Sequence, residues 1–66
     1  MSEREPTERV RNLLLRGDNL LKKGDDPQNV ARAVAAFEEA LGVAADPSVD
    51  PRVRELVERR LESVKA

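Results

Sequence analysis

Two Asp-Pro steps, Asp26-Pro27 and Asp50-Pro51, divide this 66-residue sequence into three segments. Aspartate caps the free backbone N–H groups at a helix start, and proline suits the first helical position, so each step predicts a new helix. Within each segment apolar residues recur every three or four positions, as on one face of an α-helix. We therefore expect one all-α domain over residues 1–66, with helices over about 5–23, 27–45 and 51–65. Short loops make this an up-down-up antiparallel three-helix bundle.

The first predicted helix carries signals at both of its ends. Ser2 and Glu5 have the spacing of a capping box, and Pro6 suits the first turn. Lys22 and Lys23 suit the negative end of the helix dipole, and Gly24 is typical of a left-handed cap that ends a helix. The chain is therefore expected to turn sharply just after the lysines.

Each predicted helix presents one apolar stripe to a shared core. The expected core residues are Val10, Leu13, Leu14, Gly17, Leu20, Leu21, Val30, Ala33, Val34, Ala36, Phe37, Ala40, Leu41, Val43, Ala44, Val53, Leu56, Val57, Leu61 and Val64. Arg60 falls inside the third stripe, so its stem should follow the core edge while its guanidinium reaches water or a carboxylate. On the outer face, Glu55 and Arg59 have the spacing of a stabilising pair.

The composition excludes several kinds of chemistry. The chain has no Cys and no His, which removes disulfides, thiolate metal sites and the commonest general base, so we expect no enzyme, metal or cofactor. A net charge of -1 and a single aromatic residue, Phe37, argue against nucleic-acid binding. The longest apolar run, Ala33 to Phe37, is far too short to cross a membrane, and no signal peptide is visible. These features predict a soluble cytoplasmic protein.

The whole sequence resembles a computationally designed three-helix miniprotein. Two helices start with the same Asp-Pro step, exposed positions alternate Glu with Arg, and Cys and His are absent. Every local choice agrees with the same global pattern, which is a property of designed sequences and also of natural thermophilic ones. This resemblance implies a non-enzymatic helical scaffold or protein-interaction module whose sequence mainly encodes its own fold.

The first two helices also resemble a single tetratricopeptide-like hairpin, in which small residues let antiparallel helices approach closely. The matching residues are Gly17, Leu20, Gly24, Ala33, Phe37, Ala40, Leu41, Asp46 and Pro47. Over its whole length the chain is similar to the microtubule-interacting and transport domain, which has three helices. Both resemblances imply an adaptor that binds an amphipathic helix of another protein in a groove between its own helices.

Three neighbouring residues, Leu15, Arg16 and Asp18, are the candidate partner-binding residues. Arg16-Gly17-Asp18 is the tripeptide that integrins recognise when an extended loop presents it, which leaves an integrin-binding miniprotein as an alternative function. The apolar stripe continues through Gly17, however, and this continuity predicts that the tripeptide is helical. Leu15 falls outside the stripe and would be exposed.

Gly17 lies where the first two helices are predicted to pack, so its size matters. Gly17→Leu should destabilise the chain by about 1–3 kcal/mol through overpacking. For Gly17→Ala we expect a nearly neutral result, because gained helix propensity offsets mild crowding. The Ala-rich flank of the second helix leaves self-association open as an alternative to a monomer.

Overall fold

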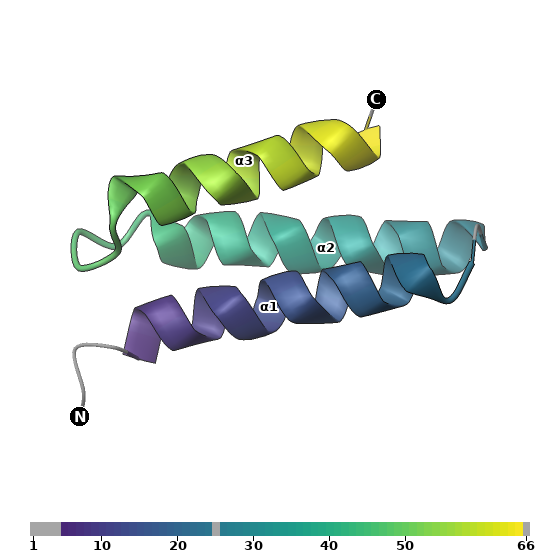
Figure 1. Cartoon of the computed structure of the whole chain (residues 1–66), viewed down its shortest axis with the longest axis horizontal. Helices are drawn as coiled ribbons and strands as arrows, with labels where there is room; N and C mark the ends of the chain where they lie inside the picture. Colours follow the sequence, from purple (N-terminus) through teal and green to yellow (C-terminus); the bar gives the residue numbers. More distant parts are fainter. Residues whose placement is uncertain (1–4, 25, 66) are drawn as a thin grey trace.

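The computed structural model describes residues 5–24 and 26–65. It contains α1 (Glu5–Lys22), α2 (Pro27–Ala44) and α3 (Pro51–Lys65), so the predicted all-α three-helix bundle is confirmed. The predicted ends of the first two helices are one residue too late, and Ser2 of the predicted capping box lies outside the described residues. α2 lies between α1 and α3, which run in the same direction (Figure 1).

Aspartate side chains cap two of the helices as the sequence predicts. Oδ1 of Asp26 accepts a hydrogen bond from the backbone N–H of Gln28 at 2.9 Å, and Asp50 does the same for Arg52 at 2.9 Å. Gly24 ends the first helical segment with φ of 127°, in the left-handed region that favours glycine. The two Asp-Pro steps and Gly24 therefore fix where the chain reverses.

Apolar side chains alone form the core of the described residues, in which no polar or charged residue is buried. α2 supplies half of the core because it packs against both other helices, whereas α1 and α3 approach each other only slightly. The molecule is correspondingly flat, measuring 36 × 22 × 13 Å. The buried residues are Val10, Leu14, Ala33, Ala36, Phe37, Ala40, Ala44, Val49, Val57 and Leu61.

The apolar spacing predicted that Leu56 lies in the core, and this prediction is wrong. Leu56 is 44% exposed, whereas its neighbour Val57 is completely buried. Because α3 packs closely against α2 alone, the buried strip on α3 is narrower than the apolar stripe in the sequence. Val57 and Leu61 form the centre of this strip, and Leu56 lies on its edge.

α1 and α2 pack tightly against each other at Gly17 and Phe37. A Cβ atom built on Gly17 would lie 2.6 Å from Cζ and 3.0 Å from Cδ1 of the Phe37 ring, and it would also clash with Cε1. Phe37 is fully buried, so its ring is enclosed by other parts of a core that is expected to be densely packed. The expectation that crowding at Gly17→Ala is mild is therefore wrong, since even one methyl group overfills this contact.

Gly17→Ala should lower the free energy of unfolding by about 1–3 kcal/mol, because either the ring or α1 must move. Gly42→Ala is the matched control, since its added Cβ meets nothing within 4 Å on the exposed side of α2. That variant should gain about 1 kcal/mol of helix propensity. Urea denaturation of the three proteins measures both effects. Equal stabilisation by the two substitutions would show that Gly17 does not touch the Phe37 ring.

The connection between α2 and α3 is held by Asp46. Its Oδ1 accepts hydrogen bonds from the backbone N–H of Ser48 at 2.9 Å and from the Ser48 hydroxyl at 2.8 Å. The backbone N–H of Val49 donates to the Asp46 carbonyl at 2.9 Å, and the Val49 side chain is 5% exposed. The sequence indicated a connection here but not that Val49 joins the core.

The Ser48 donors lower the pKa of Asp46 below its ordinary value of 3.8, with the backbone N–H as the larger cause and the hydroxyl second. The resulting stabilisation is complete above the unfolded-state pKa and is lost as the pH falls through the lower folded-state pKa. Ser48→Ala keeps the backbone donor, so it should raise the pKa of Asp46 only part of the way back. Carboxyl-carbon NMR titration measures this shift. Ser63→Ala, on the exposed side of α3, should leave the pKa of Asp46 unchanged.

Candidate functional site

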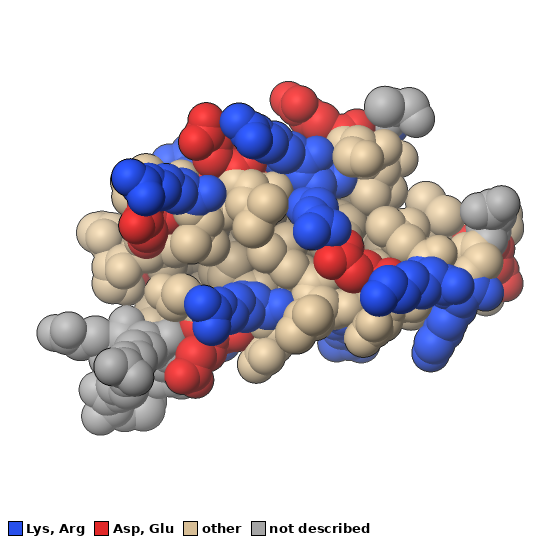
Figure 2. All heavy atoms as spheres, viewed as in Figure 1, with Lys and Arg blue, Asp and Glu red and all other residues tan. Residues whose placement is uncertain are grey.

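An ion pair joins the two helices that pack least against each other. Nη1 of Arg60 on α3 donates to Oδ1 of Asp18 on α1 at 2.6 Å, and the two side chains are 45% and 26% exposed. The prediction that the Arg60 guanidinium reaches water or a carboxylate is therefore confirmed. In Figure 2 uncharged surface lies between the charged side chains of α1 and α3, and near its middle a basic side chain on the α3 side meets an acidic one on the α1 side.

The Arg16-Gly17-Asp18 tripeptide lies in the interior of α1, as its place in the apolar stripe predicts. Gly17 is buried against Phe37, and the Asp18 carboxylate is bound to Arg60. Integrin recognition needs the two charged side chains of the tripeptide to be presented in extended form. The structure therefore lacks the loop on which that alternative depends.

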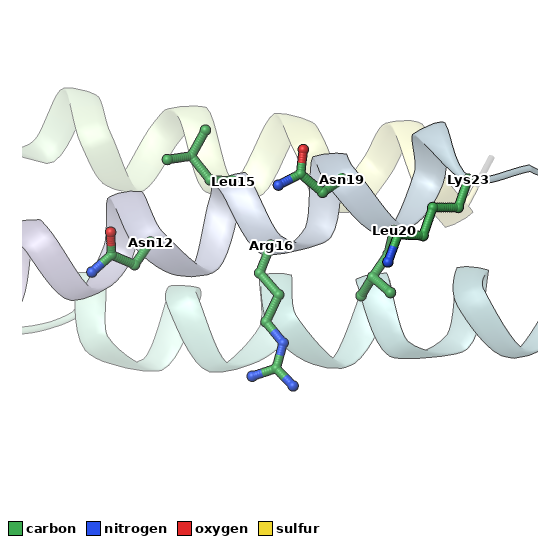
Figure 3. Close-up of a pocket in the computed structure, with 6 residues that line it drawn as sticks. All are labelled: Asn12, Leu15, Arg16, Asn19, Leu20 and Lys23. Carbon is green, nitrogen blue, oxygen red and sulfur yellow. The ribbon is translucent and has the colours of Figure 1, made fainter.

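Leu15 and Arg16 lie on a shallow depression formed by α1 and by Lys23, the residue that follows it (Figure 3). Leu15 is 60% exposed and projects to the same side of the helix as Asn19, whereas Arg16 extends away from it across α2. Asp18 is on a third side, bound to α3. The three candidate residues therefore do not converge on one site. The depression is lined by Asn12, Leu15, Arg16, Asn19, Leu20 and Lys23.

A second shallow depression lies between α1 and α2. Its floor is made by Ala35 and Ala36, and its charged rim by Arg16, Arg32 and Glu39. Neither arginine forms an ion pair within 4 Å to another residue in the ranges 5–24 and 26–65. Because the rim combines both signs of charge, it does not define one class of ligand.

The exposed leucine on α3 is the feature that sequence reasoning missed. Leu56 has arginines four residues before it and three and four residues after it, namely Arg52, Arg59 and Arg60. Side chains at these spacings are neighbours on a helix surface. The predicted Glu55–Arg59 pair is wrong, because the ion pairs within 4 Å between described residues are Arg60–Asp18 and Lys65–Glu38. The arginine spacing was visible in the sequence, but the exposure of Leu56 was not.

Two further properties hold for the part of the chain that the structure describes. No group of three or more acidic, His or Cys side chains is placed to hold a metal ion. No helix there is both long and apolar enough to span a membrane. Comparison with models of protein families, with curated proteins and with solved structures finds no match to this chain.

The Arg60–Asp18 pair should couple α1 and α3 weakly, because both side chains remain partly in water. A double-mutant cycle with Asp18→Asn and Arg60→Gln should give an interaction free energy of about 0.5 kcal/mol, falling as salt is added. Urea denaturation at low and high salt measures it. The same cycle on Lys65 and Glu38, which are 3.7 Å apart and each 58% exposed, should give a smaller value. A larger interaction free energy for Lys65 and Glu38 than for Arg60 and Asp18 would contradict the expectation that the Arg60–Asp18 pair is the stronger of the two.

Proposed function

We propose that this chain is a non-enzymatic helical scaffold that folds by itself and serves as a protein-interaction module, with the sequence of an idealised or designed bundle. The observation that carries this proposal is the contact between Gly17 and Phe37, where two helices meet without room for a single methyl group. Such a fit needs no partner to complete it, because both residues are already buried within the chain.

The helix ends support the same conclusion. Asp26 and Asp50 cap their own helices with side-chain hydrogen bonds, and Gly24 supplies the left-handed turn. Each of these local devices is worth about 1 kcal/mol, and a chain this short depends on them because its core is small. A fragment that folds only on its partner would not need all of them together.

A tetratricopeptide-like adaptor for an amphipathic helix is the second candidate function. It is favoured by the slight contact between α1 and α3, which leaves the sides of these helices unpartnered where Leu56 is 44% exposed. An adaptor of this kind folds without its ligand, as the scaffold does. It differs from a bare scaffold in having a surface that binds one kind of partner.

The isolated chain should be highly helical and should melt in one cooperative transition without any ligand. Circular dichroism at protein concentrations spanning about a hundredfold tests this, because a melting temperature that rises with concentration would indicate an obligate oligomer. Sedimentation equilibrium under the same conditions should give the mass of a monomer. A largely disordered chain would contradict the self-sufficient scaffold and would favour a fragment that folds on its partner.

A further inference from the structure

We propose that the exposed side of α3 around Leu56 binds an acidic amphipathic helix of another protein. The binding surface consists of Arg52, Leu56, Arg59 and Arg60, and we call it the α3 patch. This inference rests on the proposed role as an interaction module and names the chemistry of the partner. The adaptor resemblance does not supply that chemistry, which comes from the residues around Leu56.

The first observation is the arrangement of charge around an exposed apolar side chain. Single exposed leucines are common on protein surfaces and mean little alone. Around Leu56, however, every charged residue three or four positions away on α3 is an arginine. The fourth such neighbour is Val53, which is half-buried and extends the apolar surface toward the core. The α3 patch is therefore an apolar centre with a positive border.

The arginines of the α3 patch differ in how much of their charge is available. Arg60 is bound to Asp18 and is thereby fixed at the border facing α1. Arg52 and Arg59 are exposed and form no ion pair within 4 Å to any other described residue. Their charges can therefore attract a partner, although the chain as a whole has a net charge of -1.

The acidic residues near the α3 patch offset its positive charge only in part. Glu58 and Glu62 are two and six residues from Leu56, spacings that place them on other sides of the helix. Glu55 lies three and four residues from Arg52 and Arg59 and borders the patch beside them, although it forms no ion pair with either within 4 Å. With Asp18 also counted, three arginines face two carboxylates, and the net positive charge that remains favours an anionic partner.

Leu15 provides a comparison within the same molecule. It is more exposed than Leu56, at 60%, but its neighbours at the same spacings are Arg11, Asn12, Asp18 and Asn19. One positive and one negative charge with two amides select no partner of either sign. The exposure of a leucine alone therefore does not distinguish the α3 patch, whereas its charge does.

An acidic amphipathic helix matches both parts of the α3 patch. A leucine on the partner would remove the apolar surface of Leu56 and Val53 from water. Glutamates three or four residues on either side of that leucine would lie opposite Arg52 and Arg59, which bind carboxylates in a bidentate manner. A nucleic acid fits less well, because it offers no apolar group to Leu56 and the only aromatic side chain, Phe37, is fully buried.

The test uses the full chain and two fluorescein-labelled peptides of the same length. One peptide contains alanine, leucine and glutamate, with leucines at intervals of three and four residues, and the other has lysine in place of each glutamate. Fluorescence anisotropy should show saturable binding of the acidic peptide that weakens with salt, and at least about tenfold weaker binding of the basic one. Leu56→Ser and the double variant Arg52→Glu/Arg59→Glu should each weaken the acidic peptide at least about tenfold.

Arg54→Glu is a control for a single charge reversal, because Arg54 is exposed and lies on the opposite side of α3 from Leu56. It should change affinity by less than about twofold, and Leu15→Ser should do the same. Equal binding of both peptides, no saturation, or an equal loss with Leu15→Ser would overturn the proposal. Tighter binding to single-stranded RNA or to anionic vesicles would also overturn it. If the chain still melts cooperatively, such a result leaves the scaffold proposal standing.

Discussion

The contact between Gly17 and the Phe37 ring sets the distance between α1 and α2, and the rest of the bundle is arranged around it. Phe37 is the largest fully buried side chain among the described residues, and it fits only because the facing position of α1 has no side chain. A core built mostly from alanine and valine cannot tolerate a gap beside so large a ring. Close approach at this one point is therefore what makes a small core dense enough to hold three helices.

The same contact decides how the Arg16-Gly17-Asp18 tripeptide is used. Because Gly17 must face Phe37, its two neighbours are directed to different sides of α1, and Asp18 binds Arg60 of α3. The aspartate thus supports the packing of the third helix rather than projecting from a loop. A short motif gains its meaning from the backbone that presents it, and here the backbone is a helix in the interior of the bundle.

The central position of α2 gives the molecule its unequal surfaces. α2 packs against both neighbours, while α1 and α3 keep sides that no other helix covers (Figure 1). On α1 that uncovered side contains Leu15 among residues of mixed charge, and on α3 it contains Leu56 among arginines. One fold thus leaves two exposed leucines in different electrostatic surroundings, and only the second has the charge to select a partner.

The sequence alone determined the number and order of the helices, and their ends to within one residue, because caps, prolines and apolar spacing act within a few residues of one another. It also indicated that Gly17 faces α2 and that Arg60 reaches beyond the core. Tertiary structure decided what these positions touch: a ring that leaves no room for a methyl group, and Asp18 across the bundle. It also decided that Leu56 is exposed and Val49 buried. An apolar stripe shows which side of a helix is buried, but the width of the buried strip depends on how many helices cover it.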